Sequence, residues 1–427
     1  MRVLHAALAA VALLGAALAA SFLVVGADRA AATAGSTPRL ADQALLEHGE
    51  ALARLGNCEV CHTAPGGKPY AGGYAVVTPF GRIYSTNITP ERDTGIGLWS
   101  LEDFTRAMRQ GVRRSGEHLY PAFPYTQFAK ITDRDMEALY AYLSSVPQVN
   151  APNRANELPF PFNQRALLSG WKWLFHDASP FKPDPGRSER LNEGAYYVQS
   201  VGHCGACHSP RNLLGGERRG ESFAGGWAGD YFSPAIGARA RPVLQWTEKA
   251  MLDYLVDGRH PHHGIAAGPM QVVVDQLAKV PESMVEAVAH YLTDGATEAR
   301  DQARILKDAQ QKEFVPGRLE HPPETLLGRG EAVFAKSCSN CHRAGSPNTP
   351  LALTTSVTGP DPRTLIRLTL DGIRPPEGSP DKSMPRFSSL SDEDLAALIL
   401  YMRDRFASGA RDGDVARLVA EARRARR

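Results

Sequence analysis

Three short stretches share one pattern that decides the fold: Cys58-Glu-Val-Cys61-His62, Cys204-Gly-Ala-Cys207-His208 and Cys338-Ser-Asn-Cys341-His342. Together they use all six cysteines of the 427-residue chain. Cys-x-x-Cys-His is the attachment motif of c-type haem, because two thiols on one helical turn reach both vinyl groups of a haem. The histidine that follows then lies under the iron as its proximal ligand. We therefore predict three covalent haem c groups, held by these six cysteines and ligated by His62, His208 and His342.

Three other uses of paired cysteines fit the sequence less well. A disulfide framework would need a denser set of cysteines and gives no role to the histidine that follows each pair. A thioredoxin-like redox motif has no reason to occur three times. A structural zinc site gathers four ligands, whereas these pairs are far apart in the sequence. Covalent haem attachment uses every cysteine and every trailing histidine.

The chain around each motif repeats one helical plan. A segment with a glycine near its start leads into each motif, at Gly49, Gly194 and Gly330. After a loop-rich stretch, two amphipathic segments follow each motif. They cover residues 101–112 and 132–146, 247–258 and 281–294, and 362–372 and 391–406. Such recurrence indicates tandem copies of one small helical domain, whose haem makes up much of its core.

We therefore predict an all-α fold of three tandem class I cytochrome c domains with long loop connections and an N-terminal signal or anchor helix. The three domains, called here the first, second and third units, cover residues 40–150, 189–298 and 323–408. The remaining segments are a linker with a helix (151–188), a second linker (299–322) and a basic amphipathic tail (409–427). The linker helix either docks the first two units together or covers its own unit. The tail suits contact with a membrane or partner, or is a frayed end.

The N-terminus predicts export. Arg2 precedes an apolar run over residues 6–25, which is typical of a secretory signal within residues 1–35. The run is also long enough to remain as a membrane anchor; a buried helix is the alternative. We expect the protein on the periplasmic side of the cytoplasmic membrane. Lys and Arg number 48 and Asp and Glu 46, a balance that argues against a nucleic-acid partner.

The distal iron ligands are expected in the loop after the first amphipathic helix of each pair. That helix ends at a glycine in every unit, namely Gly111, Gly258 and Gly372. Twelve residues beyond these glycines stand Phe123, Met270 and Met384. A thioether ligand raises the reduction potential of a haem, and the shared position favours Met270 and Met384 as distal ligands over ordinary core methionines.

The first unit departs from this pattern, because Phe123 cannot ligate iron. His118 lies five residues earlier and is the tentative distal ligand of the first haem. Five-coordinate iron is one alternative, and another residue such as Met108 or Met136 is a second. Two imidazoles without a thioether would give this haem a lower potential than the other two.

Further segments outside the motifs carry a family resemblance. They are Tyr84-Ser-Thr-Asn-Ile-Thr-Pro, His118-Leu-Tyr-Pro-Ala, Glu157-Leu-Pro-Phe-Pro-Phe-Asn, Gly202-His-Cys-Gly-Ala-Cys-His-Ser-Pro-Arg-Asn, Thr354-Thr-Ser-Val-Thr-Gly-Pro-Asp-Pro-Arg and Met384-Pro-Arg-Phe. The run that begins at Glu157 is diagnostic, because haem chemistry does not require it. With these segments the chain resembles the triheme cytochrome c subunits of bacterial membrane-bound dehydrogenases for alcohols, aldehydes and gluconate. Its Phe123 looks more like the cytochromes paired with molybdenum hydroxylases.

This resemblance implies an electron-transfer subunit with no catalytic residues of its own. In that family the cytochrome accepts electrons from a large catalytic subunit that carries a molybdenum cofactor, pyrroloquinoline quinone or a flavin. It delivers them to ubiquinone in the membrane; a membrane oxidase is another acceptor. The rival hypothesis, motivated by Phe123, is a haem enzyme that acts on a small ligand such as peroxide at a five-coordinate first haem.

Overall fold

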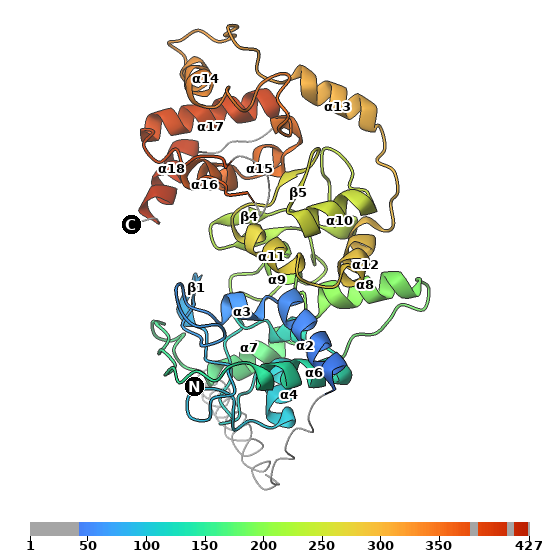
Figure 1. Ribbon diagram of the computed structural model, residues 1–427. Coiled ribbons are helices and arrows are strands. Elements are labelled where there is room, and N and C mark those ends of the chain that lie inside the picture. The colour runs from blue at the N-terminus through green and yellow to red at the C-terminus, as the bar shows by residue number, and fades with distance from the viewer. Residues whose placement is uncertain (1–41, 376–382, 408–413, 426–427) are drawn as a thin grey trace, which may run out of the picture.

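The three units lie one above another in the computed structural model, which describes residues 42–375, 383–407 and 414–425 (Figure 1). In this view the first unit is lowest, the second is central and the third is uppermost. The predicted signal or anchor over residues 1–35 falls outside the described residues. Within the described ranges, no helix combines the length and the apolarity needed to cross a membrane.

The first unit is built on two crossing helices, α2 (Gln43–Leu55) and α6 (Asp133–Ser145). Between them the chain forms the motif helix α3 (Cys58–Cys61), the hairpin β1 (Ala75–Thr78) and β2 (Gly81–Tyr84), α4 (Leu101–Gln110) and α5 (Tyr125–Phe128). A linker helix, α7 (Leu167–Phe175), leads to the second unit.

The second unit repeats this plan with the crossing pair α8 (Glu189–Gln199) and α12 (Glu282–Thr293). Between them lie the motif helix α9 (Gly205–His208), the hairpin β3 (Gly226–Ala228) and β4 (Tyr231–Ser233), the 3-10 turn η2 (Gly237–Arg239), α10 (Glu248–Asp257), the hairpin β5 (Arg259–His260) and β6 (Gly264–Ile265), and α11 (Pro269–Leu277). The second linker contains α13 (Gln302–Gln311).

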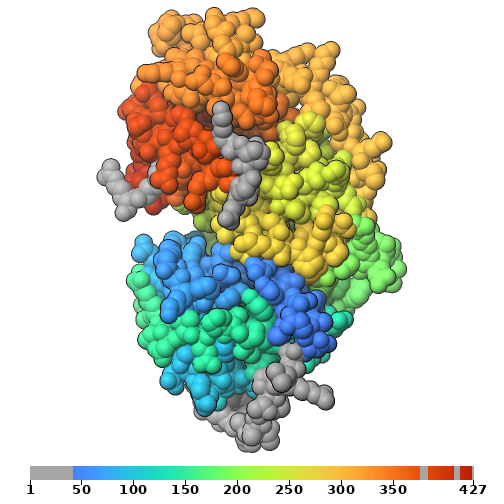
Figure 2. Space-filling model, viewed as in Figure 1, coloured from blue at the N-terminus to red at the C-terminus, as the bar shows by residue number. Residues whose placement is uncertain are grey.

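The third unit has the crossing pair α14 (Leu326–Ser337) and α17 (Asp392–Phe406). It also contains η3 (Leu351–Leu353), α15 (Thr355–Thr358), α16 (Arg363–Asp371) and the tail helix α18 (Val415–Arg424). In Figure 2 the yellow-green second unit separates the blue-to-teal first unit from the orange-to-red third unit.

One close approach recurs at all three helix crossings. Gly49 of α2, Gly194 of α8 and Gly330 of α14 each face the carbonyl oxygen of an alanine on the crossing helix. A Cβ added at these positions would stand 2.1, 2.0 and 2.1 Å from that oxygen, respectively. No side chain fits at that distance, so glycine is what allows the helices to cross this tightly. This contact explains the glycines that precede the three motifs in the sequence.

Most of the predicted local structure is confirmed. The six amphipathic segments are helices α4, α6, α10, α12, α16 and α17, and the glycines that end α4, α10 and α16 have φ values of 61°, 71° and 72°. The all-α prediction missed three two-stranded antiparallel hairpins. Their strands are only two to four residues long and carry too little periodicity to be recognised from sequence.

The first and second units share one hydrophobic core, whereas a second core consists of the third unit, the second linker, the tail helix and Leu244 of the second unit. The apolar face of α18 belongs to this second core, since Val415, Leu418 and Val419 are buried there. The expectation that the basic tail offers this face to a membrane is therefore wrong. The face is covered by the third unit, and Arg423 adds an ion pair to Asp392 at 2.5 Å.

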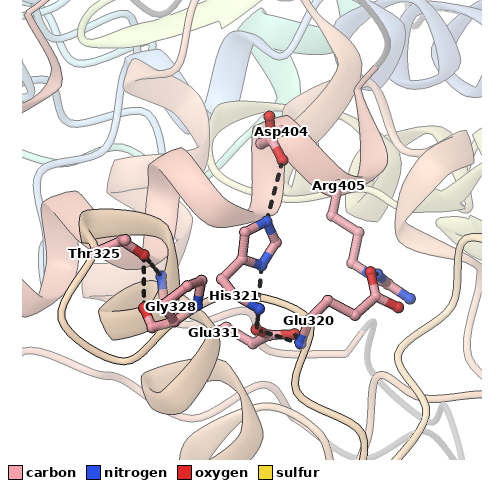
Figure 3. A network of polar contacts seen from close by, with 8 residues as sticks. Glu320, His321, Thr325, Gly328, Glu331, Asp404 and Arg405 are labelled. Atoms are coloured by element: carbon pink, nitrogen blue, oxygen red, sulfur yellow. Dashed lines mark hydrogen bonds and ion pairs between the residues drawn. The ribbon is translucent and has the colours of Figure 1, made fainter.

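A polar network attaches the second linker to the third unit (Figure 3). The carboxylate of Glu331 on α14 is 1% exposed and accepts hydrogen bonds from the backbone N–H groups of Glu320 and His321, each at 2.9 Å. The His321 ring lies 3.1 Å from the same carboxylate, and Arg405 of α17 binds the Glu320 side chain at 2.8 Å. The end of the linker is thus fixed to both crossing helices.

Candidate haem-binding sites

The three Cys-x-x-Cys-His motifs adopt one local geometry. The backbone N–H of the histidine donates to the carbonyl of the first cysteine at 2.9 Å in the first two motifs and 3.0 Å in the third. This bond closes a helical turn that places two thiols and an imidazole together. All six cysteines lie within the described ranges and are free thiols. Burial raises the pKa of the first thiol in each motif, at Cys58, Cys204 and Cys338, to about 12.

Two of the proximal histidines are oriented by a backbone carbonyl. His62 Nδ1 lies 2.6 Å from the Thr86 carbonyl oxygen, and His208 Nδ1 lies 2.7 Å from that of Pro234. A carbonyl can only accept, so Nδ1 carries the proton and Nε2 keeps its lone pair for a metal. Histidines that ligate a metal characteristically donate the N–H of their other ring nitrogen to such an oxygen. Burial lowers the pKa of both imidazoles, which favours the neutral form that iron requires.

The third proximal histidine lacks this contact. Among the described residues, Nδ1 of His342 is buried and has no hydrogen-bond partner. Burial lowers the pKa of His342 as well. The ring lines a small hollow together with Cys341, Phe314 and Phe406. The third site therefore has the same motif as the others but a different environment for its imidazole.

The first and second motifs face each other across the boundary between their units. His203, which precedes Cys204, directs its ring Nε2 to the carbonyl oxygen of Gly56 at 3.0 Å. Burial raises the pKa of the Cys61 thiol, and the nearby Cys207 thiol adds to the rise. The residues that would attach the first two haems are thus neighbours, although well separated in sequence.

The structure places Met384 in the loop expected of it, whereas Met270 lies in a helix. Met270 is the second residue of α11, directly after Pro269, and it packs against the core that also contacts Cys204. Met384 is half-buried and pairs with Ile373 through two backbone hydrogen bonds of 2.9 and 3.0 Å. Both methionines stay predicted ligands.

Phe123, Met270 and Met384 all lie twelve residues beyond the terminal glycine of a helix, but they do not occupy equivalent places in their loops. The chain after the terminal glycine of the helix folds back in each unit, and it pairs Val112 with His118, Arg259 with Ile265 and Ile373 with Met384. Met384 is itself the pairing residue of its loop. Phe123 and Met270 instead lie five residues beyond the pairing residue of theirs.

His118 is held in the wrong tautomer for iron. The Lys172 ammonium of α7 lies 2.9 Å from His118 Nδ1 and also donates to the carbonyls of Gln110 and Gly111 at 2.6 and 2.7 Å. An ammonium group only donates, so Nδ1 accepts and the proton of the neutral ring is on Nε2. Burial lowers the pKa of His118, and the charge of Lys172 lowers it further. Phe123 packs against the core that contacts Cys58.

Helix α7 contacts both of the first two units. On one side Lys172 binds the end of α4, and His176 Nε2 lies 2.9 Å from the Arg109 carbonyl oxygen. On the other, Trp171 donates to the Leu214 carbonyl at 2.8 Å and Arg219 donates to the Leu174 carbonyl at 2.9 Å. The linker helix therefore docks the two units together, and the alternative that it covers only its own unit is wrong.

The sequence did not reveal the groups that orient the proximal imidazoles. These are backbone carbonyls of Thr86 and Pro234, and no residue type marks a carbonyl as an acceptor. A hairpin precedes each of these two carbonyls, and β1–β2 and β3–β4 occupy the same place after their motifs. Recognising this hairpin in the sequence would have pointed to the two acceptors. Its strands are too short to have been recognised.

Comparison with known proteins places these sites in context. The family model described as cytochrome c matches residues 46–147, and that of the cbb3-type cytochrome c oxidase subunit III matches residues 326–402. One of the subunits of nicotinate dehydrogenase from Pseudomonas putida is 46% identical over 86% of this chain, but the chain spans only 30% of that relative. The gluconate 2-dehydrogenase cytochrome c subunit of Pantoea cypripedii is 34% identical, with 90% of each chain covered. The fructose dehydrogenase cytochrome subunit of Gluconobacter japonicus is 32% identical, over 90% of this chain and 84% of its own.

Proposed function

The chain belongs to the family of cytochrome c subunits of bacterial dehydrogenases, and from this premise we propose that three covalent haem c groups carry electrons through it. It is an electron-transfer subunit rather than a catalytic one, as these relatives are. The observation that carries the proposal is the pairing of two cysteines outside any disulfide with an imidazole whose Nδ1 donates to a carbonyl and whose Nε2 keeps its lone pair, seen at His62 and His208.

Each unit offers two thiols and an imidazole. The thiols would hold the porphyrin, and His62, His208 or His342 would ligate the iron. Met270 and Met384 would add a thioether ligand in the second and third units, which would raise the potentials of those haems. In the first unit His118 takes this place only if its contact with Lys172 opens. When bound, each haem supplies one-electron chemistry, while the apolar core around it excludes water.

We assign the electron donor to a catalytic dehydrogenase subunit of the molybdenum type. The 46% identity to a nicotinate dehydrogenase chain supports this choice over a quinoprotein or flavin partner, and so does Phe123. Ubiquinone is the proposed acceptor, with a membrane oxidase as the alternative. The apolar N-terminal run supports a location on the periplasmic side of the cytoplasmic membrane, because bacterial c-type haem is attached after export.

Haem stoichiometry tests the central part of this proposal. Full-length protein matured with a cytochrome c assembly system should contain three haems per chain by pyridine haemochrome and intact mass. The double variants C58A/C61A, C204A/C207A and C338A/C341A should each lose one haem. Two or fewer haems in the wild-type protein would contradict the proposal.

Isolation from native membranes tests the partner. Mild detergent extraction should yield this chain with a large subunit at fixed stoichiometry, and the substrate of that subunit should reduce the haems. The cofactor of the large subunit then identifies the class of dehydrogenase. Recovery of the cytochrome alone, with peroxide turnover, would instead support the haem-enzyme hypothesis, for which the relatives give no support.

A further inference from the structure

The base of the β3–β4 hairpin contacts the second haem motif and binds its proximal histidine, His208. Gly226 at the start of β3 lies so close to the motif that an added Cβ would stand 2.5 Å from the Cys207 carbonyl oxygen. Directly after β4, the Pro234 carbonyl accepts the hydrogen bond from His208 Nδ1. A movement of this hairpin would therefore change the orientation of the His208 imidazole.

The tip of the same hairpin supports the distal loop. The aromatic ring of Tyr231 packs against Gly268, where an added Cβ would lie 2.7 Å from ring carbon Cε1. Gly268 has a φ of 58° and is the N-cap of α11, two residues before Met270. The Tyr231 ring thus fills the space behind the backbone that carries Met270.

The outer face of the hairpin docks on α16 of the third unit. The Phe232 backbone N–H donates to Thr364 Oγ1 at 2.8 Å, and Asp230 pairs with Arg367 at 2.5 Å. The Tyr231 hydroxyl donates to Asp371 at 3.3 Å, at the end of α16. Figure 1 shows β4 beside α16, where the central and upper units meet.

The first unit provides an internal comparison. Its hairpin β1–β2 also precedes the carbonyl that orients a proximal histidine, at Thr86. There, however, the hairpin is backed by the linker, since Arg82 and Glu157 exchange two backbone hydrogen bonds of 2.9 Å. The turn of this first hairpin touches the second unit, because a Cβ added at Gly215 would stand 3.1 Å from Cε2 of Phe80. The second hairpin differs in that hydrogen bonds and an ion pair join it to another haem-binding unit.

We propose that the β3–β4 hairpin is a strut through which the docked third unit holds both axial ligands of the second haem, with Tyr231 as the positioning residue for Met270. This inference rests on the proposed ligation by Met270. The side chains of Thr364 and Arg367 belong to the third unit, yet their loss should loosen the distal loop of the second. The second haem then becomes more open to external ligands whenever the third unit is undocked.

Imidazole binding to the ferric triheme protein tests this inference. Imidazole competes with the thioether for iron, and the methionine methyl NMR signal, assigned with the M270A variant, reports the second haem alone. In T364A/R367M we expect the affinity of the second haem for imidazole to rise about tenfold, because a hydrogen bond and an ion pair that hold the strut are lost. The matched control R329M removes a surface ion pair with Asp394 in the same unit and should leave this affinity unchanged.

Two substitutions of Tyr231 separate its ring from its hydroxyl. Y231F keeps the ring against Gly268 and should raise the imidazole affinity only about threefold, whereas Y231L should raise it more than T364A/R367M does. Unchanged affinity in Y231L and T364A/R367M, with the Met270 signal present, would overturn the strut. If the wild-type protein shows no signal that M270A removes, the proposed ligation by Met270 is what fails.

Discussion

At the residue scale, and within the described part of the chain, the third proximal histidine differs from the other two in lacking a hydrogen bond from its ring Nδ1 to a backbone carbonyl. His62 and His208 each donate from Nδ1 to a carbonyl, whereas His342 has no such acceptor among the described residues. The donated bond makes an imidazole a stronger electron donor, which stabilises ferric iron. The three identical motifs therefore do not predict three identical haems.

The potentials of the second and third haems test this difference. Both are proposed to have His/Met ligation, so we expect the third haem to have the higher potential, by on the order of 50 mV if one hydrogen bond is responsible. A spectroelectrochemical titration measures the three potentials, and M384H, which should lower one of them markedly, assigns the third haem. A third haem at or below the potential of the second would contradict this interpretation.

A second prediction at this scale concerns the sixth ligand of the first haem, which depends on Lys172. The substitution K172M removes the ammonium that holds the proton of His118 on Nε2. We expect low-temperature EPR to show a larger low-spin fraction at the first haem and the titration to show a lower potential. K172R keeps a donor at this position and should resemble the wild-type protein. If K172M leaves both signals unchanged, His118 is out of reach of the iron.

At the scale of elements, the helix crossings depend on glycine. In G194A the new methyl group would collide with a backbone carbonyl of α12, so the crossing must open. We expect a loss of about 1–3 kcal/mol or more in the free energy of unfolding, measured by denaturant titration. G170A is the matched control, because Gly170 in α7 has nothing near its missing Cβ and alanine favours helix there. Equal stability of the two variants would show that the crossing can relax.

Elements with a clear period were predictable from the sequence, and contacts between elements were not. The helices α4, α10 and α17 followed from apolar residues on one face. The structure adds a capping serine or threonine before each of them. The haem motifs followed from residue types at fixed spacing. The hairpins were missed because their strands are too short, and the tautomer of His118 depends on Lys172, which lies in a different element.

At the scale of the whole molecule, the separate cores divide the chain into two cooperative parts. The first and second units share one core, and the third unit, with α13, α18 and the single residue Leu244 of the second unit, forms another. We expect the holoprotein to unfold in two thermal transitions. The native absorption spectrum of the third haem should be lost in only one of them. A single transition in calorimetry, with all haems changing together, would show that docking through β3–β4 couples the two cores fully.

The Glu331 network makes the third part sensitive to acid. Burial alone would raise the pKa of Glu331, but the hydrogen bonds from the His321 and Glu320 N–H groups outweigh it and lower the pKa below the usual value. A carboxyl with a lowered folded pKa stabilises the fold above its unfolded pKa of about 4.3, and this contribution is lost as the pH falls through the folded value.

The substitution E331Q should therefore lower the transition of the third part at pH 7, by about 1–3 kcal/mol in the free energy of unfolding. Below about pH 4 the difference between E331Q and the wild-type protein should shrink, because acid neutralises the same carboxylate. D394N, which weakens an exposed pair with Arg329 in the same unit, is the control and should change little. An E331Q deficit that stays constant from pH 7 to pH 3 would show that the carboxylate charge does not hold the linker to the third unit.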